Sequence, residues 1–315
     1  MIYSKKAIVW DFSILQLTEN KFWCRGVVLK GNKPWQNKKN NTLRNALSVL
    51  KTYFRPVYAN QEIKIHLQGK TITTETDARG RFEIILETNS LEVKIMMDDS
   101  YLNIENNYVT TFTAPSGYLD IISDIDDTIL VSNTSNLFKR IKTLLFFVPE
   151  KRDVIVFTQK IFQEWQEVNP RLFYVSKSES NLYGILTAFI KYNSLPKGLL
   201  ILTPYLNFTQ LIKGYKPENF KLDAVRFLIK NTRSEKYVLV GDDSQKDMFI
   251  YTIIANEFPE LILKIYIRQT GKKVSKSQSR MWQNLTATGI SASYFLPEHE
   301  DAVLEEIKKL KLKLI

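Results

Sequence analysis

An apolar run leads directly into a cluster of acidic residues at positions 119–128, which read Leu119-Asp120-Ile121-Ile122-Ser123-Asp124-Ile125-Asp126-Asp127-Thr128. Further runs of almost continuous hydrophobic residues follow along the chain at Leu172–Val175, Leu199–Leu202, Tyr237–Val240 and Leu263–Ile267. Such runs are typical of strands that are buried on both faces of a parallel sheet. We therefore expect these segments to be strands of one parallel sheet.

Helical patterns separate these expected strands. Apolar residues recur on one helical face within each of the segments 182–190, 220–229 and 250–254. A regular alternation of strand and helix is the signature of an α/β domain with helices on both faces of the sheet. The sequence therefore predicts a doubly wound parallel α/β sheet.

The first third of the chain has a different pattern. Apolar and polar residues alternate at 63–67, 82–86 and 91–95, as in half-buried strands. Before the second of these, Asp77 can accept a hydrogen bond from its own backbone and Gly80 can adopt a positive φ, which predicts a hairpin turn. This turn resembles that of transthyretin-like β-sandwich modules. We expect a smaller β-rich, sandwich-like domain over 1–117 and the α/β domain over 118–315.

Composition limits the chemistry that is available to the chain. Its 315 residues include one cysteine, Cys24, and two histidines, His66 and His299. An internal disulfide, a CxxC motif and a multi-histidine metal site are therefore excluded. An enzyme with this composition is expected to transfer protons through carboxylates.

Charge and hydropathy indicate the class of partner. The formal net charge is +11, which favours anionic partners such as phosphorylated substrates or anionic lipid surfaces. We expect no nucleic-acid partner, because no basic stripe is interleaved with aromatic residues. No apolar run reaches the length of a membrane span, and Asp11 interrupts the apolar start of the chain. We expect a cytoplasmic protein that can associate peripherally with a membrane; the sequence indicates no oligomeric state.

Acidic and polar residues stand where the expected strands end. The first strand runs into Asp124 and Asp126, the second into Ser176, and the fourth into Gly241-Asp242-Asp243 with Asp247 shortly after. Ligands of open α/β sheets bind beyond the carboxyl ends of the strands. Carboxylates gathered there repel one another without a cation, and hard oxygen ligands beside a phosphate favour Mg²⁺.

The residue types at these positions suggest phosphoryl transfer. Asp124 and Asp126 are two residues apart at a strand end and project to the same side, so one can attack phosphorus while Asp126 protonates the leaving group. Thr128 would orient this loop, and Ser176 would hold phosphoryl oxygens. Lys221 would neutralise charge in the transition state. The metal ligands are expected among Asp124, Asp126, Asp242, Asp243 and Asp247, with the choice between Asp243 and Asp247 left open.

The order of these motifs resembles the haloacid-dehalogenase (HAD) superfamily. Within it, the segments 123–129, 173–178, 195–198, 221–223 and 265–268 look like the catalytic domain of actin-patch-associated phosphatidate phosphatases, relatives of the lipins. The resemblance covers roughly residues 118–270. It implies a HAD-like fold and Mg²⁺-dependent hydrolysis of phosphatidate, with Asp124 as nucleophile and Asp126 as acid and base. Ser178 and Arg268, which stand in these motifs, are expected to support the substrate or the loops.

The sequence departs from the family pattern at three places. Asp243, Ser244 and Met248 replace the usual Ser, Gly and Pro of the fourth motif, Phe220 replaces a His before Lys221, and Thr203-Pro204-Tyr205 replaces basic residues. The chemical positions are retained, so the departures concern the substrate more than catalysis. Two alternatives stay open: a module that binds phosphatidate or another phospholipid without hydrolysing it, and a phosphatase for a soluble phosphomonoester.

Overall fold

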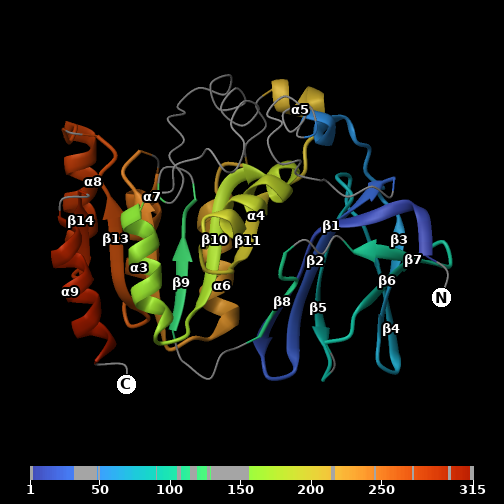
Figure 1. The fold of residues 1–315 in the computed structure, drawn as a ribbon, viewed down its shortest axis with the longest axis horizontal. Helices are drawn as coiled ribbons and strands as arrows, with labels where there is room; N and C mark the ends of the chain where they lie inside the picture. The colour runs from blue at the N-terminus through green and yellow to red at the C-terminus, as the bar shows by residue number, and fades with distance from the viewer. Residues whose placement is uncertain are drawn as a thin grey trace.

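Two β-sheets lie side by side in the computed structural model (Figure 1). The structure describes residues 3–31, 48, 50–89, 91–104, 108–113, 119–125, 128, 156–213, 217–244, 246–271, 273–296 and 299–312. Across these ranges, every helix is too short or too polar to cross a bilayer.

The second sheet is parallel and carries the acidic strand ends. Its strand order is β11-β10-β9-β12-β13-β14, and each adjacent pair is parallel. The strands are β9 (Leu119–Ser123), β10 (Arg171–Glu179), β11 (Leu199–Thr203), β12 (Lys236–Asp242), β13 (Ile262–Arg268) and β14 (Ala292–Phe295). All five hydrophobic runs are therefore confirmed as strands of one parallel sheet. The edge strand β14 was not predicted, because only Phe295 of its residues is buried and the segment forms no continuous apolar run.

Helices cover both faces of this sheet, as the alternating pattern predicts. One face packs against α3 (Val156–Gln166), α4 (Tyr183–Tyr192) and α9 (Glu300–Lys311). The other packs against α6 (Phe220–Thr232), α7 (Asp247–Glu257) and α8 (Lys276–Thr286). Successive strand residues serve opposite cores: Val238 and Val240 of β12 face the first group, and Tyr237 and Leu239 face the second. The short helices η2 (Ser180–Leu182) and α5 (Phe208–Ile212) follow β10 and β11.

The first sheet is formed by residues 3–112. Its order is β4-β3-β6-β7-β1-β2-β5, with β8 paired to β1. The strands are β1 (Tyr3–Thr18), β2 (Lys21–Lys30), β3 (Glu62–Leu67), β4 (Lys70–Glu75), β5 (Arg81–Glu87), β6 (Lys94–Met97), β7 (Ser100–Ile104) and β8 (Thr111–Phe112). The segments predicted at 63–67 and 82–86 are strands, whereas the one predicted at 91–95 begins only at Lys94.

The turn at Asp77–Gly80 forms, but it does not close a hairpin. Asp77 Oδ1 accepts hydrogen bonds from the Arg79 and Arg81 amides, at 2.7 and 2.9 Å, and Gly80 has a φ of +71°. It joins β4 to β5, which stand at opposite ends of the strand order and pair with β3 and β2 instead. The hairpin prediction was wrong because local turn chemistry does not determine which strand a segment pairs with.

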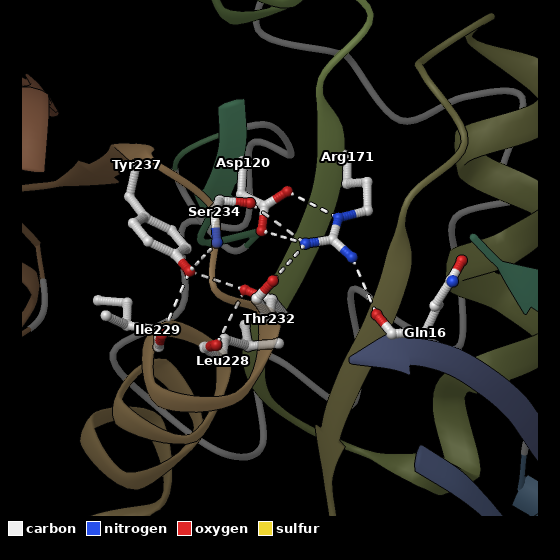
Figure 2. Close-up of polar contacts among 8 residues, drawn as sticks. All are labelled: Gln16, Asp120, Arg171, Leu228, Ile229, Thr232, Ser234 and Tyr237. Carbon is white, nitrogen blue, oxygen red and sulfur yellow. Dashed lines mark hydrogen bonds and ion pairs between the residues drawn. The ribbon is translucent and has the colours of Figure 1, made fainter. Parts of the chain in front are cut away.

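A buried arginine joins the two sheets at the edge where β9 and β10 begin. Arg171 of β10 donates to both carboxylate oxygens of Asp120 on β9, each at 2.8 Å, and to the carbonyl oxygen of Gln16 on β1 at 2.9 Å (Figure 2). The same guanidinium reaches the Thr232 carbonyl and the Ser234 hydroxyl, before β12. Figure 2 shows these groups converging from four segments of the chain.

Candidate active site

Three aspartates meet at the carboxyl edge of the parallel sheet. Asp124 follows β9, Asp242 ends β12, and Asp247 begins α7. One carboxylate oxygen of each lies within 4.8 Å of those of the other two, and all three residues are buried. The Asp124 amide donates to the Val240 carbonyl at 2.9 Å, which extends the pairing of β9 with β12 past the last strand residue. Adjacent parallel strands thus bring together residues that are more than a hundred positions apart.

Lys221, in the first turn of α6, supplies a buried positive charge. Its Nζ lies 2.8 Å from Asp124 Oδ1 and also donates to Asp247 Oδ1. Burial opposes the charged form of Lys221, but the carboxylates of Asp124 and Asp247 outweigh it and raise its pKa well above the ordinary value. The site therefore holds a fixed ammonium group against the carboxylate of Asp124.

The site has more negative than positive charge. Among the described residues, its three carboxylates face the buried ammonium of Lys221 and, at longer range, the half-buried Lys177, so negative charge is in excess when all these groups are ionised. Burial and the neighbouring Asp247 raise the pKa of Asp242 to about 6, against the opposing effect of its hydrogen bond from Ser244. Uncompensated buried charge is costly, so the cluster has a strong electrostatic demand for a cation.

Gly241 makes room for Asp247. A Cβ atom at position 241 would stand 2.6 Å from Asp247 Oδ2 and 2.9 Å from Asp247 Cβ, closer than van der Waals contact allows. Asp247 Oδ2 also accepts a hydrogen bond from the Asp242 amide at 3.3 Å. The glycine before Asp242 therefore allows the carboxylate of α7 to sit against the backbone of β12.

Two threonines support the acidic cluster. Thr128 Oγ1 donates to Asp242 Oδ2 at 3.0 Å and lies 3.5 Å from Asp124 Oδ2. The Thr158 hydroxyl, on α3, donates to the Thr128 carbonyl at 2.7 Å. Thr128 thus contacts the carboxylates of two strand ends. Sequence reasoning missed Thr158, because no motif marks a helix residue that acts through a main-chain carbonyl.

Ser176 and Ser178 shape the end of β10. Ser176 is fully buried, and its Oγ accepts a hydrogen bond from the Ser178 amide at 2.9 Å. The Ser178 carbonyl accepts from Thr203 Oγ1 of β11 at 3.2 Å. Between the two serines, Lys177 is half-buried and close enough to Asp124 and Asp247 to interact with them electrostatically; burial and Lys221 together lower its pKa. Lys177 lies within the segment 173–178, but the sequence pattern gives it no role.

Asp243 is not part of the carboxylate cluster. Its Oδ1 accepts hydrogen bonds from Thr270, at 2.9 Å from the amide and 2.5 Å from the hydroxyl, and its Oδ2 accepts from the Tyr294 hydroxyl at 2.5 Å. These partners belong to the β13 and β14 side of the sheet. Of the two candidates left open by the sequence, the structure brings Asp247 to Asp124 and Asp242 and directs Asp243 away.

Two predicted site residues remain: Arg268, whose main-chain contacts are described, and Asp126, which lies outside the described residues. Arg268 ends β13 and pairs in register with Asp242. Its carbonyl oxygen accepts a hydrogen bond from the Asp243 amide at 3.1 Å. Asp126 falls outside the described residues, so its predicted roles as acid, base and metal ligand concern a residue whose position is not described.

Comparison with known proteins gives a family match for strands β9 to β13 of the parallel sheet. Residues 119–269 match the family model described as the catalytic domain of phosphatidate phosphatase APP1. Phosphatidate phosphatase APP1 of Saccharomyces cerevisiae is 26% identical over 272 residues, which cover 81% of this chain and 41% of that protein. Residues 119–269 belong to the APP1 catalytic-domain family. The chain spans about two fifths of the length of this yeast relative.

Two further similarities are more limited than this one. An uncharacterized protein of Schizosaccharomyces pombe is 27% identical over 152 residues, covering 48% of this chain and 25% of that protein. A solved structure of cytosolic 5'-nucleotidase IIIB bound to cytidine is also similar, at 12% identity and a TM-score of 0.36. The match covers 63% of this chain and 88% of the nucleotidase chain. The APP1 catalytic-domain match therefore rests on sequence, and it includes every strand of the acidic site.

Proposed function

We propose that this chain is a phosphatase that hydrolyses phosphatidate to diacylglycerol and inorganic phosphate. The observation that carries the proposal is the buried group formed by Asp124, Asp242, Asp247 and Lys221 at the ends of β9 and β12. The match of residues 119–269 to the APP1 catalytic domain supports phosphatidate as the substrate. We extend this proposal to a HAD-like fold for residues 118–315 and a transthyretin-like sandwich for residues 1–117.

The carboxylate cluster fits Mg²⁺. Its donors are all hard oxygen atoms, it carries excess negative charge, and Gly241 leaves the space in which Asp247 approaches Asp242. Asp124, Asp242 and Asp247 would hold the ion, together with Asp126 in our proposal. When bound, Mg²⁺ neutralises charge on the phosphoryl oxygens and on the carboxylates around them.

Asp124 is the nucleophile in this proposal. Its carboxylate oxygen attacks phosphorus and forms an aspartyl-phosphate, while the bond from phosphorus to the glycerol oxygen breaks. Asp126 protonates the departing alkoxide and then removes a proton from a water molecule. That water attacks phosphorus, the bond to Asp124 breaks, and phosphate leaves with the carboxylate regenerated.

The other residues position these groups. Lys221 holds Asp124 Oδ1 by its ammonium group, which orients the carboxylate and counters charge on the phosphoryl group. We assign binding of phosphoryl oxygens to the end of β10 at Ser176, and orientation of the acidic loop to Thr128. Ser178 supports the turn that contains Ser176, and Arg268 supports the loop after β13. A cytoplasmic location with peripheral membrane association also belongs to the proposal.

Hydrolysis assays test this function. Wild-type protein is supplied with Mg²⁺ and either phosphatidate in mixed micelles or a small soluble phosphate ester, and phosphate release is measured beside the variant Asp124→Asn. We expect turnover of phosphatidate by the wild type and none by Asp124→Asn, with the fold of both verified by circular dichroism. A strong preference for the small ester would replace the lipid by a soluble substrate. Saturable binding of phosphatidate without turnover by the wild type would identify a binding module instead.

A further inference from the structure

Two phenylalanine rings stack on one another at the surface. Phe54 is 58% exposed and Phe208 is 37% exposed, and their ring centroids lie 4.6 Å apart at an interplanar angle of 23°. Phe54 ends a helical segment that includes residues 50–54, and Phe208 begins α5. Most large aromatic side chains in the described ranges are buried, so a contiguous exposed pair needs a reason. We call these two rings the Phe54–Phe208 pair.

The segments that carry the pair are held in place by packing and hydrogen bonds. Tyr53, next to Phe54, is buried in the core that also contains Tyr205. The Tyr205 hydroxyl donates to the Thr52 carbonyl, which ties the two segments together. On the other side, a capping box between Asn207 and Gln210 fixes the start of α5. The rings are therefore held outward by groups that are themselves packed or hydrogen-bonded.

The pair lies on the same edge of the sheet as the acidic site. Phe208 follows β11 by five residues, and Thr203 at the end of β11 donates to the carbonyl of Ser178, beside Ser176. The Asn181 side chain links the same region again, through both polar groups of the Leu206 backbone. Figure 1 shows α5, with the blue helical segment beside it, beyond the edge to which the arrowhead of β9 points.

The two chain segments that carry the pair are positively charged. Residues 50–55 and 203–213 contain three basic residues, Lys51, Arg55 and Lys213, and no acidic residue. Lys51 and Lys213 are exposed. Exposed aromatic rings flanked by basic side chains suit the boundary between the head groups and acyl chains of an anionic bilayer. An acidic or strongly polar surface of another protein would match the lysines but leave the two rings in contact with water or polar groups.

We propose that the Phe54–Phe208 pair inserts into the surface of anionic membranes and docks the carboxyl edge of the sheet against the lipid. The rings supply apolar contact, and Lys51 and Lys213 attract the anionic head groups. The proposal rests on the proposed function, because docking would serve to present a lipid phosphate to Asp124. Membrane binding itself does not depend on turnover and is measured separately.

Sedimentation with vesicles tests the docking surface. The full chain is mixed with vesicles of phosphatidylcholine and phosphatidylserine, which contain no substrate, or of phosphatidylcholine alone. We expect the wild type to bind the anionic vesicles. Phe54→Ser combined with Phe208→Ser should weaken this binding by about tenfold or more. Partial burial of a single ring in the bilayer would already supply the free energy of a roughly tenfold change in affinity. Lys51→Glu combined with Lys213→Glu should weaken the same binding and leave the two rings in place.

Leu312→Ser is the matched control. Leu312 is 77% exposed and follows α9, which lies beside β14 at the left of Figure 1, away from α5. This variant loses a similar exposed apolar group and should bind anionic vesicles as the wild type does. Equal vesicle binding by the wild type and the double phenylalanine variant would overturn the proposal, as would equal loss in Leu312→Ser. Self-association that disappears in the phenylalanine variant while vesicle binding persists would assign the pair to a second copy of this chain.

An activity comparison separates docking from catalysis. A short-chain phosphatidate that stays monomeric in water should be hydrolysed equally by the wild type and the double phenylalanine variant, because the variant leaves the acidic site intact. Long-chain phosphatidate in vesicles should be hydrolysed about tenfold more slowly by the variant, in parallel with its weaker binding. If the wild type hydrolyses neither substrate, the proposed function fails while the vesicle binding still decides the docking surface. Equal loss on both substrates would show that the pair serves the site itself and not docking.

Discussion

Asp243 and Asp247 are close in sequence and have different environments. The Asp247 carboxylate contacts Lys221 and lies within the carboxylate cluster, whereas the Asp243 carboxylate is hydrogen-bonded to Thr270 and Tyr294. Both residues read as metal ligands in the motif Gly241-Asp242-Asp243 and the residues after it. The difference arises from side-chain direction at the end of β12, which a sequence pattern with two candidate acids does not resolve.

The pair of variants Asp247→Asn and Asp243→Asn tests this difference. Asp247→Asn removes a charge from the proposed ion site, so we expect a higher Mg²⁺ concentration for half-maximal activity and a large loss of turnover. Asp243→Asn keeps the ion site but weakens the contacts of β12 with β13 and β14. It should lower the free energy of unfolding by about 1–3 kcal/mol and leave the half-maximal Mg²⁺ concentration unchanged. The reverse assignment of the two effects would contradict our site.

Asp242 makes the effect of Mg²⁺ dependent on pH. Without metal, the folded state raises the pKa of Asp242 from 3.8 to about 6, so it binds a proton more tightly than the unfolded chain does. Protonation of Asp242 therefore contributes to the stability of the folded state at low pH, and this contribution is lost as pH rises through 6. Mg²⁺ competes with the same proton, so the rise in Tm on adding Mg²⁺ to chelator-treated protein should be larger above pH 6 than below it. Differential scanning calorimetry across this range measures it, and a pH-independent rise would count against a metal ligand at Asp242.

At the scale of elements, the sequence predicts the buried strands well and the strand pairing poorly. Continuous runs such as Tyr237–Val240 need both faces buried, which only a sandwiched parallel strand provides, so β9 to β13 follow directly from the pattern. Strand β4 reads KTITTE and is mostly exposed, so it lacks the hydrophobic pattern that marks a strand. Its partner is determined by contacts across the sheet, which the turn at Asp77–Gly80 does not encode.

The site was predictable to the extent that chain topology controls it. Asp124, Asp242 and Lys221 had to converge once β9 and β12 were known to be parallel strands, because ligands bind at the carboxyl ends. The role of Gly241 was not predictable in this way, since it depends on how closely α7 approaches β12. Thr158 was likewise hidden, because its hydroxyl acts on a main-chain carbonyl.

The packing of α7 against β12 is tested by Gly241→Ala. The added methyl group would collide with the Asp247 carboxylate at 2.6 Å and displace it from Asp242. We expect a loss of about 1–3 kcal/mol in the free energy of unfolding and a weaker response of Tm to Mg²⁺. Gly271→Ala is the control, because the nearest atom to its added Cβ is the Lys273 carbonyl oxygen at 3.5 Å. Equal behaviour of the two variants would remove the packing argument.

At the scale of the whole molecule, the two sheets share their cores. Trp10 and Trp23 of the first sheet are both buried, and each belongs to a hydrophobic cluster that also contains residues of the parallel sheet. The Trp10 indole donates to the Ser180 carbonyl at 2.7 Å, just past the end of β10. The first sheet therefore contacts the segment that carries Ser176. Such contacts between distant segments leave no periodic trace in the sequence, which is why the role of the first sheet was not predicted.

Arg171 tests how strongly the sheets depend on one another. Its guanidinium is nearly buried and joins Asp120 to the Gln16 carbonyl of the first sheet. Arg171→Met leaves the Asp120 carboxylate buried without its cation, so we expect a loss of about 3–5 kcal/mol in the free energy of unfolding. Asp120→Asn together with Arg171→Met removes both charges and should recover part of that loss. A double variant that is no more stable than Arg171→Met alone would contradict a buried ion pair as the link.

Trapping the covalent intermediate tests the central claim most directly. Wild-type protein is mixed with Mg²⁺ and phosphatidate carrying labelled phosphorus, quenched in acid within one turnover, and digested for peptide mapping. Our account predicts acid-stable, hydroxylamine-sensitive label on the peptide that contains Asp124, and none in Asp124→Asn. Label on any other residue, or a full turnover of phosphatidate with no labelled Asp124 at any quench time, would contradict it.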